Sequence, residues 1–151
     1  MKQVMHLGFL VGNDGTSPHP SKTSALLDMT VQDMGLEPAA AARYAGMIGF
    51  YHKFFPDLNS TLAPFHQLKA KGADAREIMT SLKFFAAFEH TKHQLATVTA
   101  LARPDYTKPF YIDVDASSSV GTGAVLPQYQ DSKDLSSLRP LAFWSRRFLG
   151  E

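Results

Sequence analysis

Apolar side chains recur at steps of three and four residues through the first two thirds of the chain, which is the spacing of one helical face. The clearest run begins at Pro38, which suits a first helical turn, and ends before Pro56. Shorter helices are predicted over residues 22–29 and 60–70, and a longer one over residues 80–98. The apolar side of this longer helix is expected to consist of Phe84, Phe85, Phe88 and Leu95.

Near the start of the chain the pattern is that of extended backbone. Residues 4–11 place apolar side chains on both alternating faces, which predicts one extended segment. Gly12-Asn13-Asp14-Gly15 is a strong turn signal, because Asn and Gly accept the positive φ of a tight turn. Residues 16–21 contain Pro18 and Pro20 and are expected to lack regular structure.

After Pro104 the period of the pattern changes from that of a helix to that of a strand. Strands are predicted over residues 110–115, 121–126 and 141–145, and a polar loop at residues 128–137 leads into the last of them. Helices followed by a separate run of strands indicate the α+β class.

The composition is that of a globular protein, with 44% hydrophobic and 19% charged residues. A formal net charge of +1 excludes a strong overall attraction to nucleic acid or membranes, so any such contact must come from a local patch. The absence of cysteine excludes disulfides, thiolate zinc sites and cysteine nucleophiles. The sequence has no signal-peptide pattern and no apolar run near the roughly 18 residues of a membrane span. We therefore expect an intracellular protein, cytoplasmic or nuclear, without a membrane partner.

Candidate chemistry is concentrated in the first C-terminal strand. Asp113 and Asp115 are two residues apart, so their side chains point to the same face of a strand. Two such carboxylates repel one another unless a cation lies between them, and Mg²⁺ prefers carboxylate oxygens. Two-metal phosphodiester cleavage uses carboxylates in this way. From spacing alone, a solvated strand edge or a turn cap is the competing interpretation.

Several short motifs follow one another in a fixed order. They are Phe9-Leu10-Val11 with Pro18-x-Pro20-x-Lys22, GFYHKFFP at 49–56, Ala63-Pro64-Phe65, AFEHTK at 87–92, Asp115-Ala116-Ser117 with GTGAVLPQ at 121–128, and LAFWSR at 141–146. Their order and spacing resemble the reverse transcriptase of gypsy-type LTR retrotransposons, from the thumb and connection region into the start of the RNase H-like domain.

The resemblance implies a fold and a division of the chain. We expect a helical thumb-like part followed by the first three antiparallel strands of a truncated RNase H-like sheet. Residues 1–72 would hold the primer-grip hairpin and the thumb-like helices. Residues 73–151 would hold a connecting helix and the N-terminal part of the RNase H-like domain. The partners implied are an RNA–DNA hybrid or primer–template duplex, and the remainder of the polyprotein.

The resemblance also implies site residues. Asp115 is at the position of the first catalytic, metal-binding aspartate, Asp113 is a second candidate metal ligand, and the implied cofactor is Mg²⁺. Nucleic-acid contacts are implied in a basic segment, at Arg43, His52, Lys53, Lys69 and Lys71. A solvated helix face is the competing interpretation of these residues. The aromatic residues of the same segment are expected in the core rather than as a platform for stacking bases: Phe50, Tyr51, Phe54 and Phe55.

The departures from the family pattern limit the expected activity. The sequence has no Tyr-x-Asp-Asp polymerase motif, and it reaches Glu151 just after the third predicted strand. The resemblance implies that the next metal-binding carboxylate lies beyond that point. We therefore expect a fragment of a retrotransposon polyprotein, with RNA-directed DNA polymerase and ribonuclease H ancestry, that is inactive alone. The alternatives are a non-catalytic nucleic-acid-binding remnant and a small structural or protein-interaction module.

Overall fold

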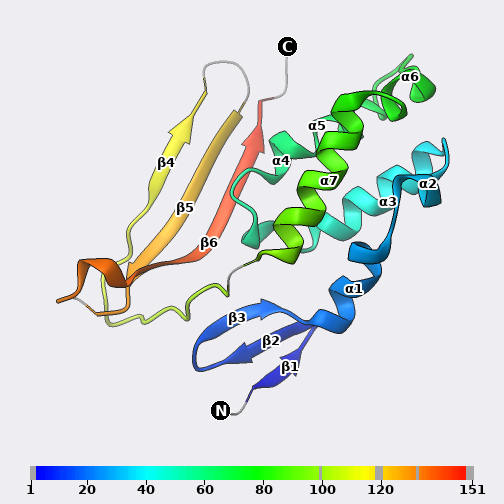
Figure 1. The fold of residues 1–151 in the computed structure, drawn as a ribbon. Coiled ribbons are helices and arrows are strands. Elements are labelled where there is room, and N and C mark those ends of the chain that lie inside the picture. Colours follow the sequence, from blue (N-terminus) through cyan, green and yellow to red (C-terminus); the bar gives the residue numbers. More distant parts are fainter. Residues whose placement is uncertain (1–2, 99, 118–120, 132, 149–151) are drawn as a thin grey trace.

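Two small antiparallel sheets flank a group of helices in the computed structural model, which describes residues 3–98, 100–117, 121–131 and 133–148. Figure 1 shows the C-terminal sheet beside the helices and the N-terminal sheet at their base. This arrangement confirms the α+β class. None of the helices in the described residues is long and apolar enough to cross a lipid bilayer.

The N-terminal sheet has the order β1-β2-β3, with every pair antiparallel. Its strands are β1 (Val4–His6), β2 (Phe9–Gly12) and β3 (Gly15–Pro18). The predicted turn is confirmed, since Gly12 pairs with Gly15 across it. The prediction of one extended segment over residues 4–11 is wrong, because Leu7 and Gly8 take positive φ and turn the chain between β1 and β2. Residues 15–18 are a strand rather than irregular, and Pro18 is tolerated because β3 is at the sheet edge.

The helical part contains more and shorter helices than the periodicity predicts. They are α1 (Pro20–Asp28), α2 (Val31–Met34), α3 (Pro38–Gly49), the 3₁₀ turn η1 (His52–Phe54), α4 (Leu58–Thr61), α5 (Ala63–Gln67), α6 (Ala75–Met79) and α7 (Leu82–Ala96). The helix predicted up to Pro56 ends at Gly49 and continues as η1. The one predicted over residues 60–70 is two helices, because Pro64 lies in the first turn of α5 and starts a new helix there.

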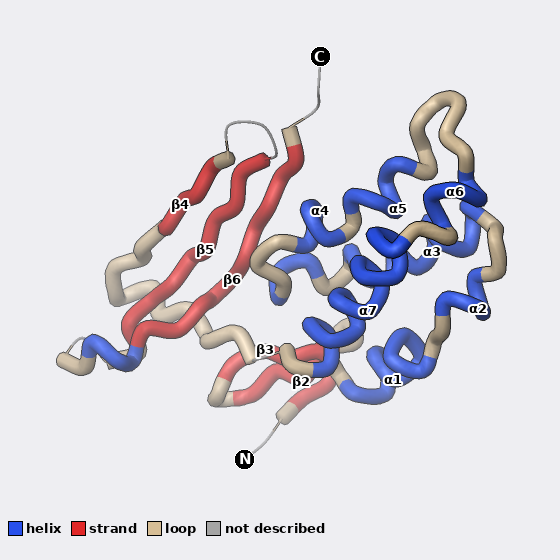
Figure 2. Tube along the Cα trace, turned by 45° about the horizontal axis from the view of Figure 1, so that its top comes forward, coloured by secondary structure: helices blue, strands red, loops and turns tan. Residues whose placement is uncertain are grey.

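Aromatic side chains make the core of the helical part. The rings of Tyr44 on α3, Phe65 on α5 and Phe88 on α7 are fully buried, with Tyr44 at 4.8 Å from Phe88 and 5.5 Å from Phe65 between ring centroids. The Tyr44 hydroxyl lies 2.7 Å from the hydroxyl of Thr91, which donates to the Phe88 carbonyl. Both views place α7 alongside α5 (Figure 2). The sequence predicts Phe85 on this face, but its side chain is 40% exposed and is not part of the buried core.

The C-terminal sheet has the order β4-β5-β6 and is antiparallel throughout. Its strands are β4 (Asp113–Ala116), β5 (Gly121–Tyr129) and β6 (Leu138–Arg147), with the 3₁₀ turn η2 (Leu135–Ser137) before the last. All three predicted strands exist, but β4 begins three residues later than expected and the other two are longer. Gly121 permits the close approach of β6, since a side chain there would collide with the backbone carbonyl of Arg146.

A buried glutamine fixes the segment that leads into β4. The Gln128 side chain is fully buried; its amide oxygen accepts from the Asp105 N–H and its amide nitrogen donates to the Asp105 carbonyl, both at 2.9 Å. Leu101, just upstream, exchanges two backbone hydrogen bonds with Thr16 of β3, at 2.8 and 2.9 Å. The connection is therefore hydrogen-bonded to both sheets, and the Ala102 N–H adds a further bond to the Pro140 carbonyl of β6 at 2.8 Å.

Gly15, at the start of β3, lies too close to the backbone of this connection for a side chain to fit. Its φ is +126°, and a Cβ would coincide with the carbonyl oxygen of Leu101. We predict that Gly15→Ala lowers the free energy of unfolding by roughly 2–4 kcal/mol, measured by urea denaturation. Gly46→Ala makes the same chemical change inside α3, where nothing lies within 4 Å of the new methyl group. It should be neutral or stabilise by up to about 1 kcal/mol. Equal effects of the two substitutions would show that the β3 connection is not packed as described.

Candidate functional site

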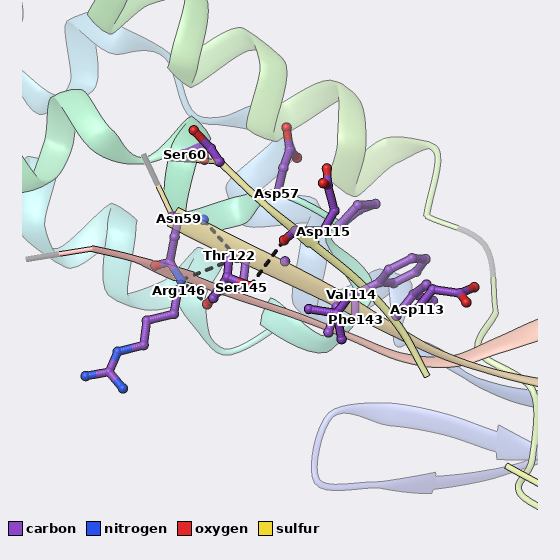
Figure 3. Close-up of a pocket in the computed structure, with 16 residues that line it drawn as sticks. Asp57, Asn59, Ser60, Asp113, Val114, Asp115, Thr122, Phe143, Ser145 and Arg146 are labelled. Carbon is purple, nitrogen blue, oxygen red and sulfur yellow. Dashed lines mark hydrogen bonds between the residues drawn. The ribbon is translucent and has the colours of Figure 1, made fainter. Parts of the chain in front are cut away.

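Asp115 lies in the wall of an open pocket between the C-terminal sheet and the segment that leads into α4. The pocket has a volume of about 420 Å³; on the sheet side it is lined by β4, β5 and β6, and on the helical side by residues between Pro56 and Ser60. We call it the sheet pocket. Figure 3 shows the labelled side chains around it. Asp115 pairs with Gly123 of β5, and its backbone carbonyl accepts from the Thr122 hydroxyl at 3.1 Å.

Three carboxylates line the sheet pocket, but they do not form a metal centre. Asp113 and Asp115 are both exposed on β4, and Asp57 comes from the helical side. An oxygen of Asp57 already accepts from the amide of Gln94 at 2.9 Å. Within the described ranges, no three Asp, Glu, His or Cys side chains come together closely enough to hold an ion. Two-ion hydrolysis needs more ligands than these carboxylates supply. The carboxylates therefore fit only one part of a two-metal centre.

Asn59 and Ser145 join the helical part to the C-terminal sheet. The Asn59 side-chain amide donates to the Ser145 carbonyl and, at 3.3 Å, to the Ser145 hydroxyl, which also accepts from the Asn59 N–H at 3.4 Å. Phe143, two residues earlier on β6, packs against the core of the helical part. No sequence pattern singles out Asn59, because its partner is 86 residues away.

A second pocket lies on the other side of this contact. It has a volume of about 300 Å³ and is lined by His52 of η1, His66 of α5 and Trp144 of β6, with Asn59 and Ser145 shared with the sheet pocket. We call it the junction pocket. Burial lowers the pKa of His66, and the positive charges of Lys69 and Arg147 lower it further. This pocket is therefore in a basic environment that two distant parts of the chain create together.

The five predicted nucleic-acid contacts are not gathered on one surface. His52 lines the junction pocket, while Arg43 lines a separate groove of about 580 Å³ beside α2. Lys53 lies over the ring of Phe9, with its Nζ at 4.3 Å from the centroid, and burial lowers its pKa. Lys69 and Lys71 are exposed after α5.

The aromatic residues of the same segment are mostly core, as expected. Tyr51, Phe54 and Phe55 are buried. Phe50 is the exception, because it is 53% exposed and stacks on Phe9 of β2 with 5.1 Å between ring centroids.

Comparison with known proteins gives a consistent picture. Residues 85–151 match the family model described as the RNase H-like domain found in reverse transcriptase. The chain is 32% identical over 152 residues to the Pol polyprotein of transposon opus from Drosophila melanogaster, covering 95% of this chain and 14% of that protein. It is 29% identical over 136 residues to the Pol polyprotein of transposon gypsy from the same organism, covering 84% of this chain and 13% of that protein. The chain thus spans about one seventh of the length of these relatives.

The fold has a match among solved structures. A foamy viral protease-reverse transcriptase in complex with an RNA/DNA hybrid superimposes with a TM-score of 0.72 at 16% identity, over 97% of this chain and 19% of that one. Because the identity is low, this match concerns the fold. The resemblance read from the motifs is confirmed by the matches to the transposon polyproteins.

The pKa of His66 tests the geometry of the junction pocket without any ligand. Its pKa is lowered in the folded chain, so the unfolded chain takes up a proton first, and His66 reduces stability as the pH falls through the ordinary histidine range. We predict that Arg147→Gln raises the pKa of His66, measured by NMR titration of its ring resonances. Arg76→Gln removes the same charge on α6, at the far end of the helical part, and should leave that pKa unchanged. An unchanged pKa in Arg147→Gln would contradict the docking of β6 beside α5.

Proposed function

We propose that this chain, a homologue of one stretch of the Pol polyproteins of gypsy-type retrotransposons, holds a nucleic-acid duplex against an RNase H-like sheet. The duplex would be an RNA–DNA hybrid or a primer–template, and the remainder of the polyprotein would be the physical partner of this stretch. The solved foamy viral reverse transcriptase, which carries an RNA/DNA hybrid, supports this choice of ligand. Residues 1–72 would act as the thumb-like part, and residues 73–151 as the connecting helix and the start of the RNase H-like domain.

The observation that carries the proposal is a local basic patch on a chain that is almost neutral overall. The net charge is only +1, yet His66, Lys69 and Arg147 come together at the junction of α5 and β6. His52 lies in the same pocket as His66. A duplex has a charge every ~1.7 Å along its axis, so such a patch is an effective local contact for its backbone. Lys71 is exposed two residues after Lys69, and Arg43 and Lys53 are the outlying candidates.

Asp115 is the residue that we assign to catalysis in the complete domain, with Asp113 as an accessory ligand. RNase H-like domains generally use divalent metal ions. A Mg²⁺ ion held by these carboxylates would supply activation of water and stabilisation of the leaving oxygen. Asp115 fits this role because its strand is paired through β5 to β6 and its side chain lines an open pocket. The described residues do not complete the ligand set, so we expect the chain alone to bind a hybrid without cleaving it.

The test is the binding of a fluorescently labelled RNA–DNA hybrid to the whole chain, followed by anisotropy across a salt series. We expect affinity to fall steeply as salt rises, because each neutralised phosphate releases counterions. The double variant Lys69→Gln, Lys71→Gln should reduce the slope of log K against log salt by roughly 1 to 2. The double variant Lys83→Gln, Lys133→Gln removes the same charge from exposed positions on α7 and in the β5–β6 connection, and should leave the slope unchanged.

The outcomes separate the competing functions. Absence of binding at low salt by a folded chain would refute the duplex-holding function and favour a structural or protein-interaction module. Equal slopes of log K against log salt for the two double variants would show that the duplex does not bind at the α5–β6 junction. Magnesium-dependent cleavage that is lost in Asp115→Asn would overturn the expectation that the chain alone is inactive.

A further inference from the structure

The junction pocket has a chemistry that the holding of a duplex does not explain. A duplex lies on a surface, whereas His52, His66 and Trp144 surround a concave pocket of about 300 Å³. That volume is at the lower end of the range for small-molecule sites. Gly49 and Ala45 of α3 line it with almost no side chain, which leaves its interior open. The pocket is therefore sized for one small polar unit rather than for a length of helix.

The charges around this pocket favour an anion. Of the residues described as lining it, none carries a carboxylate, and the two imidazoles are its titratable groups. The charged side chains that act on His66 are Lys69, from the segment after α5, and Arg147, from the end of β6. Both carry positive charge. His52 has its Nδ1 at 3.2 Å from the Gly49 carbonyl, so a hydrogen on Nδ1 would be engaged there and Nε2 would remain for another partner.

Trp144 adds a second kind of contact. Its side chain is 47% exposed and lines the same pocket. An indole beside a basic pocket can stack on a nucleobase while the cations hold the adjoining phosphate. A base inside a duplex is paired and stacked on its neighbours, so its face is not free for such a contact. An unpaired base presents its whole face.

We propose that the junction pocket binds one unpaired nucleotide of a strand that extends beyond the duplex, with its phosphate at His66, Lys69 and Arg147 and its base on Trp144. The inference rests on the proposed function in that the helical part holds the adjoining duplex. The site is composite, because helical residues between Ala45 and His66 supply one wall and β6 the other. A chain in which the two parts separate loses the pocket even if each part stays folded.

Trp144 also provides the measurement, because it is the only tryptophan in the sequence. The experiment compares a blunt RNA–DNA hybrid with the same hybrid carrying a short single-stranded extension. Tryptophan emission of the whole chain is followed during each titration, while binding is measured separately by anisotropy with labelled nucleic acid. We expect the extended hybrid to quench Trp144 strongly and to bind about tenfold more tightly than the blunt one, since stacking of one base is a substantial contribution.

The variants test separately which residue contacts the base and which contacts the phosphate. Trp144→Ala should remove the tenfold preference for the extension, and Trp144→Phe should retain part of it. Arg147→Gln should weaken binding of the extended hybrid about fivefold, and Arg147→Lys should restore most of that loss. Arg76→Gln, on α6, is the matched control and should change neither affinity nor quenching. Urea denaturation of each variant shows whether its fold is intact.

A pH comparison gives an independent readout. A phosphate beside His66 favours the protonated imidazole, so binding of the extension takes up a proton and strengthens as the pH falls from 8 to 6. His66→Gln should abolish most of the pH dependence of binding. The other charged or titratable groups that face the pocket or act on His66 are His52, Lys69 and Arg147.

Two results would overturn the inference. Equal affinity for the two hybrids, or binding of the extension without a change in Trp144 emission, would show that no unpaired nucleotide enters this pocket while leaving the duplex-holding function intact. Failure of the proposed function is a different result, since neither hybrid would then bind at low salt.

Discussion

The contact between Asn59 and Ser145 is the constraint on which both candidate sites depend. It joins α4 to β6 through three hydrogen bonds between the same two residues. Both residues line the sheet pocket and the junction pocket, so the contact forms the partition between them. Phe143 supports it by packing on the core of the helical part. Each pocket has one wall from the helical part and one from the C-terminal sheet. Neither pocket would therefore exist if the two parts separated.

The two pockets differ in the charged groups that surround them. On the sheet side are the carboxylates of Asp57, Asp113 and Asp115, together with the single cation of Arg146. On the junction side are imidazoles, together with Lys69 and Arg147. A nucleic-acid backbone is attracted to the second side and repelled by the first unless cations neutralise it. In the account proposed here, the basic side holds the strand and the acidic side meets it only through bound metal.

The sequence predicted the elements better than their arrangement. The three C-terminal strands, the long helix and the turn at Gly12–Gly15 were recognisable because their periods and turn residues are local signals. The resemblance to gypsy-type polyproteins, read from the order of the motifs, is confirmed by the relatives. The break at Leu7 and Gly8 was missed because positive φ at a leucine has no sequence signature.

Of the candidate sites, only the position of Asp115 on a strand could be predicted from the sequence. The identification of Asp115 followed from its motif, and its catalytic role stays a prediction, as does the division of the chain at residue 72. The junction pocket could not have been predicted, because its walls come from residues 45–66 and from Trp144 and Ser145, which no short-range pattern connects. Trp144 and Arg147 were visible in the sequence only as part of a strand motif and a terminal basic pair.

Hydrogen exchange of the whole chain, with and without a bound RNA–DNA hybrid, tests most directly whether the two parts act together. We expect a bound hybrid to slow exchange of backbone amides at residues 58–67 and also at residues 143–147, because the ligand stabilises the contact between α4 and β6. Slower exchange confined to the helical part, with the strand β6 unaffected, would contradict a composite nucleic-acid site.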